Sequence, residues 1–239
     1  MRNELFNPDF YYLSGTLSKY LDPHPFVGLL IQPDTASMKR RVAEFDVWGA
    51  DNGCFAKGPD FDLARYLDWL SSMAAFSGSC LFATAPDVVG DPRATVARSL
   101  PVLPTIRKLG YKAAMVAQDG FEFMLEADPS LWDRFDVLFL GGTTDWKIGT
   151  DPSEAWIRMF EEAHIRDKWV HMGRVNSQKR VTIASRGLGC SSGDGNFLKY
   201  DPRSQAPLSW VTNANLSDDM VERNLGTKAA FALRDKRAA

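Results

Sequence analysis

The chain has 239 residues, of which 45% are hydrophobic and 24% charged, as in an ordinary globular protein with a full core. These values exclude an intrinsically disordered chain. Lys and Arg number 28 and Asp and Glu number 30, so the net charge is −2 and no global positive field indicates a nucleic-acid partner. A local basic patch is still compatible with this balance.

The sequence contains no segment typical of export or of a membrane anchor. Residues 1–9 include acids and Pro8 where a signal peptide needs an uninterrupted apolar stretch. No stretch approaches the roughly 18 apolar residues of a membrane span. We therefore expect a cytoplasmic protein with no membrane partner. Nothing in the sequence indicates an oligomeric state.

The cysteines and histidines do not form a metal-binding pattern. Cys54, Cys80 and Cys190 are separated by 26 and 110 residues, which matches neither a disulfide framework nor zinc-ligand spacing. The three histidines form no HExxH pair. The sequence predicts buried, reduced thiols, no bound metal and no cofactor.

Short apolar runs of strand length alternate with amphipathic stretches of helix length. The strand candidates are Phe26 to Ile31, Asp46 to Ala50, Cys80 to Thr84, Lys112 to Ala117, Phe135 to Leu140, Trp169 to Met172 and Leu188 to Cys190. The helix candidates are Thr35 to Glu44, Phe61 to Phe76, Pro92 to Leu109, Ser153 to Ile165, Ser177 to Arg186 and Ser217 to Arg234. An eighth strand is either Tyr11 to Leu17 or a short polar segment after Asp194.

This alternation predicts βαβ units and a mostly parallel sheet, either a closed barrel or an open doubly wound sheet. Polar or glycine-containing segments follow successive strands from Asp51 to Asp194, on average about 29 residues apart. That spacing is close to the roughly 31 residues per unit of an eight-unit barrel. We therefore predict a (β/α)8 TIM barrel as a single compact domain over residues 1–239, irregular at its first or last strand.

In such folds the chemistry lies where the strands end, because the loops that follow the strands gather there. The residues found there are Asp51, Asn52, Gly53, Asp87, Gln118, Asp119, Gly141, Gly142, Gly173, Arg174 and Asp194. Any single Asp beside Gly or Asn is more often a turn or a helix cap. Asp91 and Asp151 each precede Pro and predict helix starts, and His171 is expected to be a hydrogen-bonded core residue.

The order of these strand-end motifs resembles the tRNA-guanine transglycosylase superfamily. It is most similar to the compact, phage-type DpdA-like enzymes that exchange guanine in DNA for a 7-deazaguanine. The matching segments are Asp51-Asn52-Gly53-Cys54-Phe55, Asp87, Val116-Ala117-Gln118-Asp119-Gly120, Gly141-Gly142-Thr143, Met172-Gly173 and Asp194. They fall within residues 47–195, and their joint order is more specific than any one motif.

One departure from the superfamily concerns the nucleic acid. The enzymes that act on tRNA carry a zinc site of three Cys and one His near the C-terminus, whereas this chain has no Cys after Cys190. The resemblance therefore implies DNA as the partner, with tRNA as the alternative, and 7-cyano-7-deazaguanine as the incoming base.

The resemblance also implies roles for the strand-end residues. Asp194 would attack C1′ of the sugar and Asp51 would act as general acid/base, although the reverse assignment stays open. The base-binding candidates are Asp87, Gln118, Gly141, Gly142, Thr143, Met172 and Phe55, with Trp146 as a further apolar wall. Arg174, Lys199 and Arg203 are candidates for contacts with the nucleic-acid backbone.

Three other functions fit parts of the pattern. A glycosidase would use the same residues if water replaced the incoming base. A sugar-processing barrel also carries carboxylates at strand ends, but Gln118 and the glycine pair disfavour it. A barrel that binds a purine without chemistry would have no need of both Asp51 and Asp194.

Overall fold

The computed structural model describes residues 10–15, 24–34, 39–200 and 205–215, without the side chains of residues 199, 200, 205–207 and 213. The helix expected over Ser217 to Arg234 and the start of the one expected over Thr35 to Glu44 lie outside these residues.

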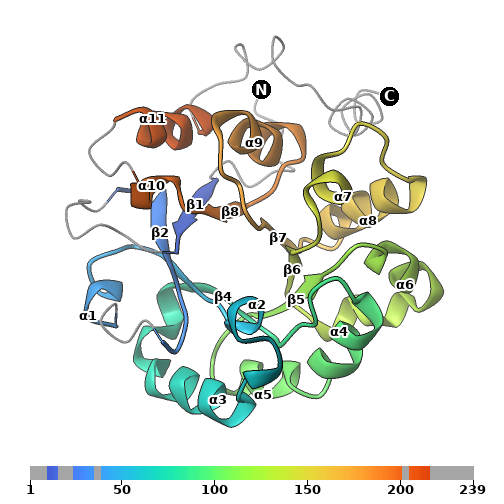
Figure 1. Ribbon diagram of the computed structural model, residues 1–239, viewed down its shortest axis with the longest axis horizontal. Coiled ribbons are helices and arrows are strands. Elements are labelled where there is room, and N and C mark those ends of the chain that lie inside the picture. Colours follow the sequence, from blue (N-terminus) through green and yellow to red (C-terminus); the bar gives the residue numbers. More distant parts are fainter. Residues whose placement is uncertain (1–9, 16–23, 35–38, 201–204, 216–239) are drawn as a thin grey trace.

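Eight parallel strands form a closed barrel, as the spacing of the strand-end motifs predicted (Figure 1). The strands are β1 (Tyr11–Ser14), β2 (Val27–Ile31), β3 (Trp48–Ala50), β4 (Cys80–Thr84), β5 (Ala113–Ala117), β6 (Val137–Leu140), β7 (Trp169–Met172) and β8 (Ser192–Gly195). Each strand pairs with its neighbours in chain order, and β1 pairs with β8 to close the ring. The chain therefore has a TIM-barrel fold.

The helices alternate with the strands, and the longer ones surround the strands in an outer ring (Figure 1). The helices are α1 (Lys39–Val42), α2 (Cys54–Lys57), α3 (Leu63–Ser72), α4 (Pro92–Ser99), α5 (Leu103–Lys108), α6 (Phe121–Ala127), α7 (Thr144–Ile148), α8 (Glu154–Ile165), α9 (Gln178–Thr182), α10 (Phe197–Tyr200) and α11 (Gln205–Ala214). A π-helical segment, Ile183–Gly187, continues α9. None of the helices described is long and apolar enough to cross a membrane.

The structure corrects the prediction for the last strand and identifies the strand that the sequence left unassigned. The segment Leu188 to Cys190 was wrongly predicted as a strand, since β8 is the following run Ser192–Gly195. Leu188 and Cys190 are instead buried in the core outside the barrel. The missing strand is β1, whose residue Leu13 pairs with Asp194 across the closing seam. Asp194 therefore lies inside the last strand rather than after it.

Local sequence explains where several helices begin and end. Asp91 caps α4 by accepting a hydrogen bond from the backbone N–H of Ala94, as predicted. Asp151 does not cap α8, because Ser153 takes that position. The single helix expected over Pro92 to Leu109 is split into α4 and α5, since Pro101 lacks an N–H and disfavours helix at the residue before it.

The core has two layers, one on each side of the strands. The barrel interior holds Leu13, Phe82, Ala114 and Val137, with Leu30, Val47, Leu81, Phe139 and Trp169 packed against them. The larger cluster lies between the strands and the helices and includes Trp48, Tyr66, Trp156 and Phe160. All three cysteines are buried and free, as predicted.

The barrel interior leaves no room for a side chain at Gly28 of β2. A Cβ there would overlap the carbonyl oxygen of Val47 and lie 2.8 Å from Leu13 Cδ2. We expect Gly28→Ala to lower the free energy of unfolding by about 1 to 3 kcal/mol, measured by urea denaturation. Gly78→Ala is the matched control, because a Cβ at Gly78 meets nothing within 4 Å. Equal stability of the two variants would contradict the packing described.

Candidate active site

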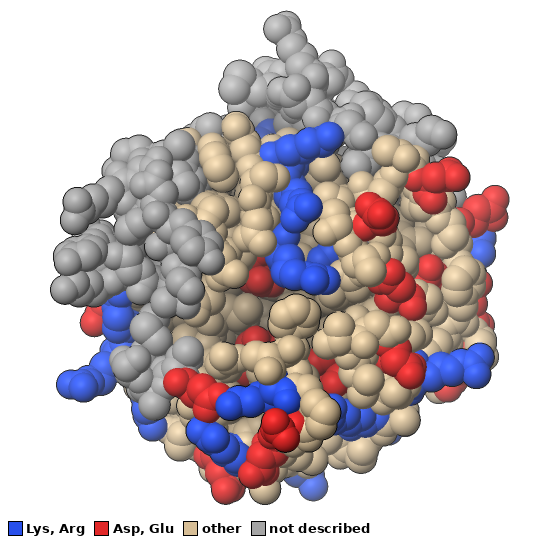
Figure 2. All heavy atoms as spheres, viewed as in Figure 1, with Lys and Arg blue, Asp and Glu red and all other residues tan. Residues whose placement is uncertain are grey.

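The polar strand-end residues meet at the mouth of the barrel formed by the C-terminal ends of the strands. The loops after β3, β4, β5, β6 and β7 bring Asp51, Asp87, Gln118, Gly141 and Arg174 to this end, and β8 contributes Asp194. Figure 2 shows this face, with blue Lys and Arg surface running from the rim toward the centre and red acidic surface visible in the central hollow.

Asp194 points into the barrel from the closing strand β8. Its Oδ1 atom lies 3.0 Å from His171 Nε2 and 3.3 Å from the backbone nitrogen of Arg174. The side chain is 16% exposed, whereas the His171 side chain is fully buried. Asp194 is thus a carboxylate at the floor of the mouth that solvent or a ligand can reach from above.

A chain of hydrogen bonds inside the barrel sets the orientation of the His171 ring. Trp169 Nε1 donates to Ser192 Oγ at 2.8 Å, and Ser192 Oγ lies 2.8 Å from His171 Nδ1. Burial lowers the pKa of His171, which favours the neutral ring. With Ser192 donating to Nδ1, the ring proton lies on Nε2 and points at the carboxylate of Asp194. In this arrangement the ring N–H donates to Asp194 Oδ1.

Asp51 follows β3 in a different electrostatic environment. Burial raises its pKa to about 6, and the negative charges of Asp194 and Asp87 act in the same direction. The N–H of Gly53 donates to Asp51 Oδ1 at 3.3 Å and partly offsets these effects. Asp51 therefore carries a proton at mildly acidic pH and loses it near neutrality.

Asp87 lies between two side-chain amides. Gln118 Nε2 donates to Asp87 Oδ2 at 3.0 Å, and Asn52 Nδ2 lies 3.3 Å from Asp87 Oδ1. The carbonyl oxygen of the Gln118 amide accepts from the backbone N–H of Gly90 at 3.1 Å. Burial raises the pKa of Asp87. Gln118, a base-binding candidate, therefore uses its amide to hold Asp87 and Gly90.

The glycine pair after β6 presents its carbonyls to Arg174. The Arg174 guanidinium donates to the carbonyl oxygens of Gly141 at 2.9 Å and Gly142 at 2.6 Å. The N–H groups of both glycines donate to the carbonyl of Ala117, so these base-binding candidates have no backbone N–H free for a base edge. A Cβ at Gly142 would meet Trp146 Cε3 at 2.6 Å, so only glycine fits against that ring.

Thr143 and Asp119 fix the loop that follows β6. The Thr143 N–H and hydroxyl donate to the two carboxylate oxygens of Asp119, both at 2.6 Å. Thr143 also caps α7 by accepting from the N–H of Trp146. The side chain of Thr143 is therefore engaged in the loop rather than directed at a ligand.

The apolar candidates lie in three different places. Phe55 on α2 is 72% exposed, with the Arg174 guanidinium 5.8 Å from its ring centre. Trp146 is partly buried and donates to Glu122 at 3.0 Å. Met172 is 2% exposed and belongs to the core behind the strands, so it does not line the mouth. Because strand residues alternate between faces, His171 points inward and Met172 outward.

The basic candidates are only partly described. Arg174 reaches the mouth and adopts a left-handed backbone conformation with φ of 61°, uncommon for a residue other than glycine. The side chains of Lys199 and Arg203 lie outside the described residues.

Two residues beside Asp194 were not predicted as part of the site. His171 was expected only as a core residue, although its strand position places it opposite Ser192 and beside Asp194. Lys147 on α7 was not considered, because a lysine in a polar loop-and-helix segment is usually exposed. It is 3% exposed here, and burial lowers its pKa to about 8. The burial of Lys147 is evident only in the tertiary structure, where α7 packs against the barrel.

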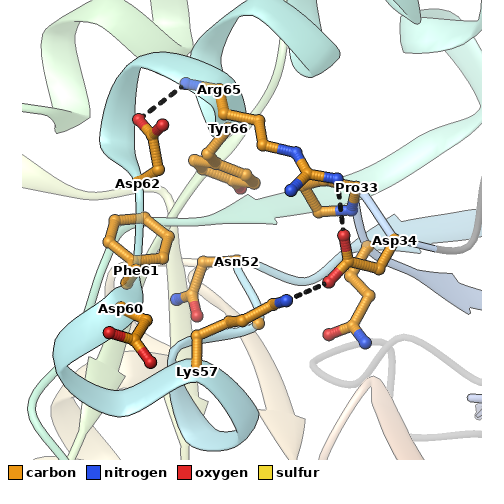
Figure 3. Close-up of a pocket in the computed structure, with 11 residues that line it drawn as sticks. Pro33, Asp34, Asn52, Lys57, Asp60, Phe61, Asp62, Arg65 and Tyr66 are labelled. Carbon is orange, nitrogen blue, oxygen red and sulfur yellow. Dashed lines mark hydrogen bonds and ion pairs between the residues drawn. The ribbon is translucent and has the colours of Figure 1, made fainter.

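A small pocket of about 50 Å³ lies beside the mouth between the loops after β2 and β3 (Figure 3). Asp34 bridges Lys57 and Arg65 across it, at 2.7 Å in each case. This volume is far below the roughly 300 Å³ or more of ordinary ligand pockets, so this pocket is not a candidate site for a purine. Within the parts of the chain described, no group of three or more His, Cys, Asp or Glu residues is arranged to hold a metal ion.

No family model and no curated protein matches the chain. Among solved structures, a mutant tryptophan synthase α-subunit from Pyrococcus furiosus superposes with a TM-score of 0.47 and 11% identity, over 87% of this chain and 97% of that one. Tryptophan synthase from M. tuberculosis superposes with a TM-score of 0.42 and 10% identity, over 87% and 93%. At these identities the likeness concerns the fold alone.

The raised pKa of Asp51 predicts that its ionised carboxylate lowers the free energy of unfolding at neutral and alkaline pH. Its pKa is about 6 in the folded chain against an ordinary 3.8, so the free energy of unfolding falls as pH rises through that interval. Asp51→Asn removes the half-buried charge while its amide oxygen keeps the hydrogen bond from Gly53. We expect urea denaturation at about pH 8 to give a gain of roughly 1 to 3 kcal/mol. A gain of equal size near pH 4, where the carboxyl is protonated, would refute this cause.

Proposed function

We propose that the protein exchanges guanine in DNA for a 7-deazaguanine base through a covalent aspartyl-sugar intermediate. The observation that carries the proposal is the contrast between two carboxylates at one barrel mouth. Asp194 receives hydrogen bonds suited to an ionised nucleophile, whereas Asp51 has a pKa of about 6. Environments that differ in this way separate a nucleophile from a general acid/base.

The first half of the reaction forms a bond from Asp194 to the sugar. An oxygen of Asp194 attacks C1′ as the bond from C1′ to N9 of guanine breaks, and the electron pair of that bond leaves with the base. Protonated Asp51 supplies the proton that the departing guanine takes up. His171 and the N–H of Arg174 hold the carboxylate of Asp194 in place during this step.

The second half reverses these steps with the incoming base. Ionised Asp51 removes the proton from the ring nitrogen of the 7-deazaguanine that attacks C1′, and the ester to Asp194 breaks. The phosphate chain stays intact throughout, and both carboxylates return to their starting states. Water in place of the incoming base would give hydrolysis, which is the glycosidase alternative.

Asp87 is the residue best suited to recognise guanine. Guanine offers N1–H and N2–H donors on one edge, and a carboxylate that accepts both would distinguish it from adenine. Hydrogen bonds from the side-chain amides of Gln118 and Asn52 fix the orientation of the Asp87 carboxylate. The target base must leave the helical stack to reach this depth, and exposed Phe55 at the rim is available to stack on neighbouring bases.

The direct test is base exchange by the purified protein. Double-stranded DNA and tRNA are each incubated with 7-cyano-7-deazaguanine, and the nucleosides are released by nuclease digestion and analysed by mass spectrometry. We expect the modified deoxynucleoside with wild type and a loss of roughly 10⁴-fold or more in Asp194→Ala. Asp91→Asn is the matched control, because Asn also caps a helix.

Other outcomes of this assay would overturn the proposal. Modification of tRNA alone would indicate the tRNA branch of the superfamily. Free guanine without incorporation would make the protein a glycosidase, and full activity of Asp194→Ala would remove the nucleophile proposed.

The pKa of Asp51 predicts the pH dependence of guanine release. Because the departing base takes its proton from Asp51, release of labelled guanine in single turnover should slow about tenfold per pH unit above roughly pH 6. The Asp51→Asn variant should be slow and lack this slope. A rate in wild type that increases with pH between about 6 and 7.5 would show that Asp51 is not the proton donor.

A further inference from the structure

Lys147 is a buried cation beside the candidate nucleophile, on the helix α7 that follows β6. Its Nζ atom donates to the backbone carbonyl of Gly173 at 2.6 Å, and the residue is 3% exposed. Among the described residues, no carboxylate forms an ion pair with it. A buried ammonium without an ion-pair partner is costly, so its position calls for a reason beyond packing.

The carbonyl that Lys147 contacts belongs to the same peptide unit as the N–H that faces Asp194. The Gly173 carbonyl accepts from Lys147, and the N–H of Arg174 lies 3.3 Å from Asp194 Oδ1. In a trans peptide the C=O and N–H point in opposite directions, so Lys147 and Asp194 lie on opposite sides of this unit. The peptide links the ammonium to the carboxylate in one hydrogen-bonded line.

The backbone conformation at Arg174 is unfavourable by itself and depends on hydrogen bonds from side chains. Arg174 has φ of 61°, in the left-handed region that side chains other than glycine rarely adopt. Arg180 donates to the carbonyl of Arg174, and the Arg174 guanidinium donates to Gly141 and Gly142. Lys147 fixes the other side of the turn by holding the preceding carbonyl.

We propose that Lys147 is a positioning residue for Asp194, whose ammonium orients and polarises the Gly173–Arg174 peptide so that its N–H donates to the carboxylate. A charged donor makes a stronger hydrogen bond, so the Lys147 ammonium polarises the peptide whose carbonyl it contacts. A polarised peptide in turn has an N–H that donates more strongly. The activity readout of this inference rests on the proposed function, but its structural readout does not.

The charge that Lys147 supplies is itself dependent on pH. Burial lowers its pKa to about 8, and the cations Arg174 and Arg180 act in the same direction. Asp194 and Asp119 face it with negative charge and oppose that shift. Lys147 is therefore charged below about pH 8 and becomes neutral as the pH rises through that value, which weakens the hold on the peptide.

The first experiment follows the backbone amide of Arg174 by NMR in the full-length protein without substrate. In wild type, this amide resonance should shift with a midpoint near pH 8, as Lys147 loses its proton. In Lys147→Arg the step should vanish and the resonance should keep its low-pH position. In Lys147→Met the resonance should lie near the high-pH position at every pH. An Arg174 amide that does not respond to pH in wild type overturns the proposal without any variant.

The second experiment measures base exchange by the same variants. We expect Lys147→Met to lose roughly 10-fold to 100-fold in rate, as for a hydrogen bond to a charged group, and Lys147→Arg to recover much of it. Lys168→Met is the matched control, since Lys168 Nζ donates to the carbonyl of Phe135 at 2.7 Å, next to the opposite end of β7. A rate unchanged in Lys147→Met, whose side chain keeps the packing, would refute the role.

The two experiments separate this inference from the proposed function. If wild type exchanges no base while the Arg174 amide responds to Lys147 as described, the function fails and the link from Lys147 to Asp194 stands. If exchange proceeds normally in Lys147→Met, the function stands and the link fails.

Discussion

Closure of the barrel by hydrogen bonds between β1 and β8 is the constraint on which the candidate site depends. The closing strand is four residues long and contains two glycines, so it contributes little apolar surface of its own. Its register against β7 places Ser192 opposite His171, and its register against β1 places Asp194 opposite Leu13. Without this closure Asp194 would not share the mouth with Asp51 and Asp87.

The polar groups inside the barrel depend on one another for their charge states. A neutral His171 donates to Asp194 when Ser192 Oγ donates to its other ring nitrogen, and Trp169 Nε1 in turn donates to Ser192 Oγ. The buried acids and Lys147 lower the stability of the fold, because each is partly removed from water without a full ion pair. Ionisable groups with shifted pKa values in a cleft are typical of functional sites, where neighbouring groups need different protonation states.

The sequence was sufficient to predict the barrel because strand-end motifs recur at the spacing of a βα unit. Apolar runs located β4 and β7 within their observed bounds. They failed at β8, where the apolar segment Leu188 to Cys190 packs outside the barrel and the strand itself is made of small and polar residues. The short helices α6 and α7 carry too few turns to show a helical period, so they were not predicted.

The sequence was sufficient to predict the acidic residues of the candidate site, but not all of the residues that surround them. Asp51, Asp87 and Asp194 do gather at the mouth, because parallel strands bring their ends together. Met172 was misplaced since the alternation of strand side chains turns it toward the helices. Lys147 could not be predicted, because its burial and its contact with Gly173 result from the tertiary fold and not from any local pattern.

A covalent bond from Asp194 to the sugar distinguishes the proposed reaction, and peptide mapping of the protein after reaction with DNA detects that bond. The protein is incubated with guanine-containing DNA in the absence of free base, denatured, digested with protease and nuclease, and analysed by mass spectrometry. We expect a deoxyribose-linked fragment on the peptide that contains Asp194, and its disappearance when 7-cyano-7-deazaguanine is added before denaturation. A sugar adduct on Asp51 instead, or base exchange that proceeds with no adduct on either residue, would contradict it.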